Sequence, residues 1–233
     1  YCSNKKFQVI NDDVRNYKLL SNEIGKYEVI IPLAALVGAP LCSKREEDAE
    51  SINLNHNLKL FKMIKKDQII LMPTTNSAYG HGKENQIFDE KSKLKPISLY
   101  AKHKVIVEEE LMNLDNAVSL RLATVFGMSP RMRLDLLVNN FVYKALNDKY
   151  MVLFESNFKR NYIHVRDVAR AFVHCLDNIS SMKNEIYNLG LEDANLSKKE
   201  LCQKINNHID FHYYEEEFKK DEDQRNYIVS NKK

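Results

Sequence analysis

A tyrosine and a lysine stand four residues apart in the segment SLYAKHK, residues 98–104, at the start of a stretch with helical spacing. Residues four apart share one face of an α-helix, so Tyr100 and Lys104 are expected to lie close together. A phenol has a pKa near 10 in water, and an ammonium group about 4–6 Å away lowers it by favouring the phenolate. The pair therefore predicts a base that takes the proton of a secondary alcohol while hydride leaves the same carbon. Because this spacing also arises by chance, a surface pair is the alternative.

An apolar run upstream ends in hydroxyl side chains, in the segment ILMPTTNSAYG, residues 70–80. Parallel sheets present their ligands at the carboxyl ends of strands. A hydroxyl at this end, on Thr75, is expected to hydrogen-bond the reacting oxygen and hold it against Tyr100. The alternative role of Thr75 is an ordinary cap between strand and loop. We predict Thr75, Tyr100 and Lys104 as the catalytic residues.

Short β-rich runs alternate with longer amphipathic ones along the chain, which predicts an α/β fold with a doubly wound, Rossmann-like parallel sheet. The predicted strands are 7–10, 27–31, 68–72, 117–123, 151–154 and 185–190. The predicted helices lie near 43–66, 98–114, 134–147, 165–179 and 197–207. Ser98 is placed to begin the Tyr100 helix, and Asn195 or Ser197 can cap the last one. We interpret the acidic stretch 214–225 as a solvated loop, with a domain edge as the alternative.

Composition indicates a globular chain, with 44% hydrophobic and 29% charged residues among 233. The net charge of +3 has no basic block, so no nucleic-acid partner is expected. The four cysteines are far apart and form no metal-binding pattern with the histidines, which favours free thiols, a reducing compartment and no metal. No apolar run approaches the roughly 20 residues that a membrane span needs. We therefore expect a cytoplasmic protein with no membrane partner.

Several segments, in order, resemble the extended short-chain dehydrogenase/reductase family, specifically its nucleotide-sugar epimerase/dehydratase branch. Besides the strand-end hydroxyls and Y-x-x-x-K, the similar segments are NDDVRN (11–16), IIPLAALVGAPLC (30–42), NLNHN (53–57), RLATVFGMSPRMR (121–133) and KRNYIHVRDVARA (159–171). They cover nearly the whole chain. The resemblance implies a dinucleotide-binding domain over 1–127, lacking its N-terminal part, and a smaller nucleotide-sugar-binding α/β part over 128–233. Segments within 151–190 are expected to return to the main sheet.

The resemblance implies NAD as the cofactor, with NADP not excluded because the selecting segment is absent. It assigns acid/base chemistry to Tyr100, and to Lys104 both the lowering of its pKa and a contact with the nicotinamide ribose. Cofactor contacts are implied at Asp13, Val14, Leu33, Ala34, Ala35, Val37 and Asn53, besides Tyr100 and Lys104. Asp13 has a turn aspartate as its alternative reading. The amide of Asn53 is expected either to tie neighbouring strand ends or to touch the cofactor.

A nucleotide-diphosphate sugar is the implied substrate. The substrate-binding candidates are Ser77, Thr124, Asn139, Arg160 and Arg225, with Arg133 as a weaker one. The planar guanidinium of Arg160 suits phosphate oxygens, and Arg225 resembles a second such group, although surface ion pairs are the alternative for both. We interpret His164 as a hydrogen-bonded structural histidine rather than a catalyst.

Two departures from the family pattern bear on the reaction. Thr124 stands where many relatives have Asn, which alters one contact to the substrate. Asn76 and Ser77 stand where the 4,6-dehydratases have Asp-Glu, and neither can shuttle a proton near neutrality, which argues against elimination of water. We therefore expect an NAD-dependent nucleotide-sugar C4 epimerase.

The alternatives are a net C4 oxidoreductase, a 4,6-dehydratase and, from another class, a non-catalytic dinucleotide-binding protein. The Gly-rich phosphate loop and the C-terminal end of the family pattern are missing, so we expect a fragment. Relatives also suggest a homodimer built from the helices near 98–114 and 134–147, with the alternative that the apolar stripes of these helices belong to the core.

Overall fold

The main sheet has four parallel strands in a computed structural model that describes residues 6–83, 85–216 and 223–233. Its order is β1-β2-β4-β8, and each neighbouring pair is parallel. The strands are β1 (Val29–Ile30), β2 (Ile69–Thr75), β4 (Ala117–Leu122) and β8 (Glu185–Leu189). The sheet order differs from the chain order, as crossover connections require. The predicted α/β class with a parallel, Rossmann-like sheet is confirmed.

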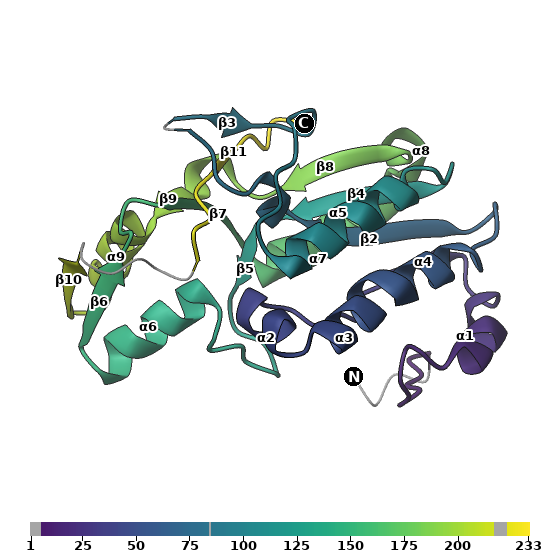
Figure 1. Cartoon of the computed structure of the whole chain (residues 1–233), viewed down its shortest axis with the longest axis horizontal. Coiled ribbons are helices and arrows are strands. Elements are labelled where there is room, and N and C mark those ends of the chain that lie inside the picture. The colour runs from purple at the N-terminus through teal and green to yellow at the C-terminus, as the bar shows by residue number, and fades with distance from the viewer. Residues whose placement is uncertain (1–5, 84, 217–222) are drawn as a thin grey trace.

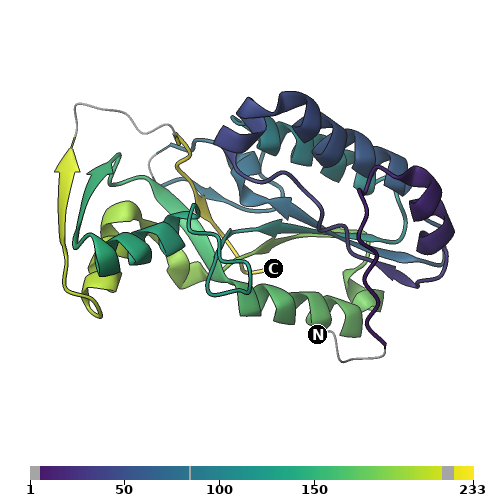
Figure 2. The same cartoon turned by 90° about the horizontal axis from the view of Figure 1, so that it is seen from below.

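Helices cover both faces of this sheet (Figures 1 and 2). α4 (His56–Phe61) and α5 (Leu99–Leu111) pack on one face, and α7 (Val165–Asp177) packs on the other. β2 serves both cores because its side chains alternate: Ile70 and Met72 join the first cluster, whereas Leu71 joins the second. Two buried cores on opposite faces explain why the central strands read as continuous apolar runs.

Helix starts follow the sequence closely where a capping side chain is present. The hydroxyl of Ser98 accepts a hydrogen bond from Ala101 N at the start of α5. Ser197 and Glu200 form a capping box before α9 (Lys198–Asn206). The single helix predicted over 43–66 is instead four consecutive pieces: α2 (Ala39–Lys44), α3 (Glu46–Ala49), the π-helix η1 (Glu50–Asn55) and α4.

The C-terminal half builds a separate core around α6 (Leu137–Asn147) and α9, beside a parallel pair of strands, β6 (Tyr150–Phe154) and β10 (His212–Glu216). Figure 2 shows these elements at the opposite end of the molecule from α4 and α1 (Tyr17–Ile24). The remaining elements are η2 (Asn76–Tyr79), β3 (Ile87–Phe88), β5 (Thr124–Phe126), β7 (Lys159–His164), α8 (Ile179–Met182), η3 (Glu192–Ala194), β9 (Asn195–Ser197) and β11 (Ile228–Val229). Among them, β5, β7 and β9 form a three-stranded sheet in the order β5-β7-β9, and β11 pairs with β3.

Three secondary-structure predictions, two of strands and one of a loop, need correction. Residues 7–10 are exposed and belong to none of the sheets that the described residues form. The predicted strand 151–154 is real but pairs with β10 outside the main sheet. Part of the predicted acidic loop, 214–216, belongs to β10, and 217–222 lie outside the described residues.

In the described part of the chain, no helix combines the length and apolar character that a bilayer crossing demands.

Candidate active site

Thr75 lies at the carboxyl end of β2, buried with 7% of its surface exposed. Its Oγ1 accepts a hydrogen bond from Ser77 N at 3.1 Å and so caps η2. The following turn requires Gly80, whose φ is +72° and where a Cβ would collide with the carbonyl of Lys95. The capping role foreseen for Thr75 is present, and it leaves the hydroxyl proton available because the oxygen acts only as acceptor in this bond.

The ammonium group of Lys104 is buried and donates to the carbonyl of Pro73, a β2 residue, at 2.9 Å. Burial lowers the pKa of Lys104 to about 8. One of its three donors is used in this bond, which leaves two for a further partner. The lysine thus ties α5 to the strand that ends in Thr75.

Tyr100 is partly exposed near the start of α5. Burial of the phenol raises the pKa of Tyr100 to about 12, the nearby Cys42 thiol acts in the same direction, and the charge of Arg225 opposes both. The predicted lowering of this pKa by Lys104 is therefore wrong for the protein as described. The physical reason is that desolvation dominates, and the cation that acts on the phenol is Arg225 from the C-terminal segment.

Arg225 and Arg160, which come from distant parts of the sequence, converge on Asp223. Arg225 Nε donates to Asp223 Oδ1 at 2.7 Å, and Arg160 Nη2 lies 2.8 Å from the same oxygen. Arg225 also donates to Ser77 Oγ, beside the capped turn that follows Thr75. Burial raises the pKa of Asp223, but the two guanidinium groups outweigh it and hold that pKa well below its usual range. Arg160 is 3% exposed and packs over the ring of Tyr227.

The segment after β1 supplies a partly exposed, apolar surface at the same edge of the sheet. Leu33 is 68% exposed, whereas Ala34, Ala35 and Val37 are half-buried. Asn53 is different: it is fully buried, its Oδ1 accepts from Leu36 N at 2.8 Å and its Nδ2 donates to Leu36 O at 2.8 Å. These bonds give Asn53 its other foreseen role, tying neighbouring segments, and its cofactor contact stays a prediction.

Asp13 and the half-buried Val14 lie on the segment before α1, away from the Arg160 and Arg225 cluster in sequence and fold. The carboxylate of Asp13 accepts from Arg15 Nη2 at 2.6 Å and from Arg15 Nε at 2.9 Å. These bonds to the guanidinium hold the pKa of Asp13 below its usual range, so the group is a carboxylate at neutral pH. The side chain remains 50% exposed and can accept further donors.

The polar residues predicted on the substrate side make contacts within the fold. The amide of Asn139, which is 6% exposed, accepts from Gly127 N and donates to Arg133 O, both at 3.0 Å, and so holds the 127–133 loop, while its substrate contact stays a prediction. Arg133 itself is ion-paired with Asp135. Thr124 is half-buried in β5 and pairs with Tyr162 of β7. His164 caps α7 through its ring nitrogen, as expected of a structural histidine.

Two polar groups near this edge, those of Asp223 and Tyr162, were missed from the sequence, and Asn76 was considered only as a departure from the dehydratase pattern. Asp223 lies in the stretch 214–225, which the sequence analysis interpreted as a solvated loop. The amide of Asn76, in η2, and the hydroxyl of Tyr162 are buried, and neither has a hydrogen-bond partner among the residues that the structure describes. Tyr162 adjoins Arg160 in the same motif, which is the only sequence signal that could have singled it out. Unpartnered buried polar groups at one edge of the sheet are suited to a polar ligand.

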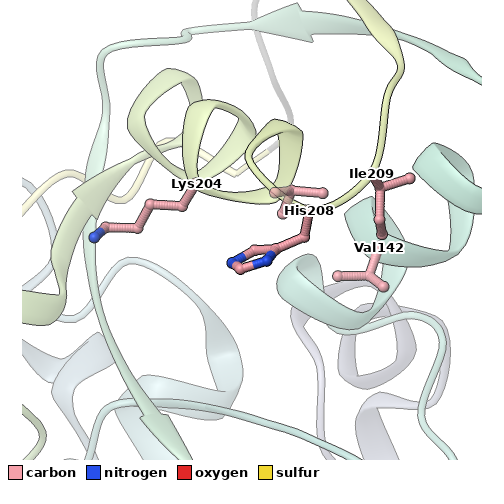
Figure 3. Close-up of a pocket in the computed structure, with 5 residues that line it drawn as sticks. Val142, Lys204, His208 and Ile209 are labelled. Carbon is pink, nitrogen blue, oxygen red and sulfur yellow. The ribbon is translucent and has the colours of Figure 1, made fainter.

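Two surface pockets flank α6. One, of about 270 Å³, lies between α6 and the end of α9 and is lined by Val142, Lys204, Ile205, His208 and Ile209 (Figure 3). The other, of about 330 Å³, lies between α6 and the 127–134 loop and is mostly apolar, with Asn139 among its lining residues. Neither is lined by Thr75, Tyr100 or Lys104, so neither carries the predicted chemistry.

Solved structures of nucleotide-sugar enzymes share this fold. The UDP-glucuronic acid 4-epimerase from Bacillus cereus, in complex with UDP-glucuronic acid and NAD, aligns with a TM-score of 0.85 at 22% identity, over 98% of this chain and 74% of that chain. The dTDP-glucose 4,6-dehydratase DesIV from Streptomyces venezuelae, with NAD bound, aligns with a TM-score of 0.82 at 20% identity, over 98% of this chain and 72% of that chain. At these identities the likeness establishes the fold alone.

Sequence comparison identifies the family. An uncharacterized Schizosaccharomyces pombe protein, PB2B2.11, is 26% identical over 78% of this chain, which spans 61% of that relative's length. The family model described as NAD dependent epimerase/dehydratase family matches residues 2–190, most of the chain. The chain therefore belongs to the NAD dependent epimerase/dehydratase family.

Proposed function

We propose that this protein is an NAD-dependent nucleotide-sugar epimerase that oxidises the sugar transiently at C4. The observation that carries the proposal is the meeting of two elements at the carboxyl edge of the sheet. α5, which bears Tyr100 and Lys104, packs against β2 and η2, where Thr75 presents its hydroxyl. This arrangement offers a proton acceptor and a hydrogen-bond donor to one alcohol oxygen.

In this proposal Tyr100 exchanges the proton of the C4 hydroxyl, and Thr75 donates to the same oxygen and orients it. NAD, when bound, supplies the acceptor that takes hydride from C4 and returns it to the opposite face. The residues present fit such a cofactor. Lys104 has two donors beyond its bond to Pro73, and the surface after β1 is apolar with small side chains at Ala34 and Ala35.

Arg160 and Arg225 are proposed to hold the diphosphate of the substrate, because two guanidinium groups meet at a single carboxylate and suit phosphate oxygens. The unpartnered groups of Asn76 and Tyr162 are available to sugar or nucleotide hydroxyls. The structural neighbour from Bacillus cereus was crystallised with a UDP-sugar, which supports this class of substrate. Asn76 and Ser77 argue against a dehydratase, because an amide and an alcohol do not titrate near neutral pH.

The test is to incubate the full-length protein and NAD with UDP-, GDP-, CDP- and dTDP-sugars, and to follow the products by NMR and NADH by absorbance. We expect the C4 epimer of one sugar and no net NADH. Net NADH with a keto sugar would instead establish a C4 oxidoreductase.

A matched variant tests the assignment of Tyr100. Tyr100→Phe should lower kcat by about 10²-fold or more, the range for loss of a general acid/base, while NADH binding measured by fluorescence is retained. Phe keeps the ring that packs in the site and removes only the hydroxyl. Wild-type turnover in this variant would remove the proposed mechanism and favour a dinucleotide-binding role.

A further inference from the structure

A buried carboxylate lies on the same side of α5 as the predicted catalytic pair. Tyr100, Lys104 and Glu108 follow one another at intervals of four residues, which aligns them along one face of the helix. Glu108 is 4% exposed, although carboxylates are rarely buried without partners. Its partners therefore indicate what the residue does.

Both oxygens of Glu108 are occupied by donors from the two central strands. Oε2 accepts from Thr74 Oγ1 at 2.9 Å and from Ser119 Oγ at 2.6 Å, and these two hydroxyls are themselves 2.9 Å apart. Oε1 accepts from Arg121 Nη2 at 2.6 Å and from Arg121 Nε at 3.0 Å. Hydrogen bonds to an ionised group are short and strong, so this carboxylate fixes α5 to β2 and β4 together.

The network continues across the sheet. Arg121 Nη1 donates to the hydroxyl of Tyr79, in η2, at 3.0 Å and to the carbonyl of Glu90 at 3.1 Å. The Tyr79 hydroxyl lies 2.6 Å from Asn188 Oδ1, in β8. One buried network of polar groups thus links α5, the turn after Thr75 and three strands of the sheet, β2, β4 and β8.

We propose that Glu108, acting with Thr74, is a positioning residue that sets where the Tyr100 phenol lies relative to Thr75, an inference that rests on the proposed function. Thr74 directly precedes Thr75, and Lys104 bonds the carbonyl of Pro73. Two successive turns of α5 are therefore fastened to two successive residues of β2. Because a helix moves as a unit, loosening Glu108 shifts Tyr100, and a misplacement of about 1 Å costs on the order of 10²-fold in rate.

The test uses a matched pair of variants in the full-length protein. Thr74→Val removes the hydroxyl at nearly constant shape, whereas Thr74→Ser keeps it. Thr74→Val is expected to lower kcat for the nucleotide sugar by about 10-fold or more, with an unchanged KM, because the network does not include Arg160 or Arg225. Thr74→Ser should restore most of kcat, and Glu110→Gln, an exposed carboxylate on the same helix, should match the wild type.

The rates are compared at a temperature where thermal melts show every variant folded. Wild-type kcat in Thr74→Val, or an equal loss in Thr74→Ser, would overturn the proposal. A rise in KM without a fall in kcat would do the same, because it would place the effect in substrate binding.

A second readout needs no turnover. In protein labelled with ¹³C at tyrosine Cζ, the Tyr100 resonance is assigned by its loss in Tyr100→Phe. It should shift in Thr74→Val and in Glu108→Gln, and stay in place in Glu110→Gln. If the wild type converts no nucleotide sugar, the proposed function fails, but a shifted Tyr100 resonance still supports the positioning role. An unmoved resonance in folded Thr74→Val overturns it.

Discussion

Among the described residues, the arginine–carboxylate cluster around Glu108 and the one around Asp223 differ in charge balance. In the first, Glu108 and Arg121 pair one to one, and their side chains are 5% and 4% exposed. In the second, Arg160 and Arg225 share the carboxylate of Asp223, so the members of this cluster that the structure describes carry two positive charges and one negative. The Asp223 side chain is also 32% exposed.

The difference separates a fold element from a binding element. The Glu108 cluster is neutral and its acceptors are filled by protein donors, so it has no capacity for a ligand and serves to fix α5. Counted over the described residues, the Asp223 cluster carries excess positive charge next to the Tyr162 hydroxyl, which has no hydrogen-bond partner among those residues. Because buried charge is costly unless it is paired, an incoming anion would stabilise this cluster.

The largest expected difference between the two clusters is in how much their loss lowers the free energy of unfolding. Glu108→Gln leaves Arg121 buried without its counter-ion and is expected to lower the free energy of unfolding by about 3–5 kcal/mol. Asp223→Asn should cost less, because water reaches that carboxylate. Asp135→Asn, which breaks an exposed pair with Arg133, should change it by less than about 1 kcal/mol. Urea unfolding measures all three, and equal losses in Glu108→Gln and Asp223→Asn would erase the distinction.

Affinity for a nucleoside diphosphate should depend on the second cluster alone. Arg160→Gln removes one charged donor and is expected to weaken UDP binding by about 1.5–3 kcal/mol, or roughly 10- to 100-fold, in isothermal titration calorimetry. Arg133→Gln is the control, because this arginine lies outside the cluster. Unchanged UDP affinity in Arg160→Gln, or equal weakening in the control, would remove the binding role of the cluster.

Sequence patterns predicted the features that depend on local periodicity and capping. The strands β2, β4 and β8, the helices α5 and α7, and the Ser98 and Ser197 caps all follow from residues within a few positions of one another. The short strands β3, β5, β7, β9 and β11 were not predicted, because two to six residues carry little periodic signal and their partners are distant in sequence.

The sequence indicated which residues lie near the candidate site better than it indicated what each of them contacts. Thr75, Ser77 and Arg225 do converge, but Asn53 and Asn139 turned out to satisfy backbone groups, a distinction that depends on tertiary neighbours. The partner of Arg160, Asp223, is 63 positions away and lies in an acidic run whose composition resembles a solvated loop. Nothing local marks Glu108 as buried, since Glu109 and Glu110 beside it are exposed.

Lys104 differs from the arginines of both clusters, because it is a buried cation whose partner is a carbonyl rather than a carboxylate. Burial lowers its pKa from 10.5 to about 8. Below pH 8 the lysine is charged in both states and the burial cost is fully present. Between pH 8 and 10.5 the unfolded state binds more protons, so stability should rise with pH. Lys104→Met should flatten this rise and add on the order of 1–3 kcal/mol at neutral pH. An unchanged pH slope by chemical denaturation would contradict the shifted pKa.

The smallest expected effect concerns the side of the second cluster that faces Tyr100. Because the charge of Arg225 opposes the rise in the pKa of Tyr100 caused by burial and by Cys42, Arg225→Gln should raise that pKa further. The acid limb of the kcat/KM profile, where the phenol must lose its proton, should then move to higher pH, while Arg225→Lys keeps it near the wild-type position. Lys104, on the same helix, is unchanged in both variants. If Arg225→Gln raises KM and weakens UDP binding but leaves the limb unmoved, Arg225 acts only as a phosphate ligand beside Arg160, and the cluster has no part in setting the acidity of the phenol.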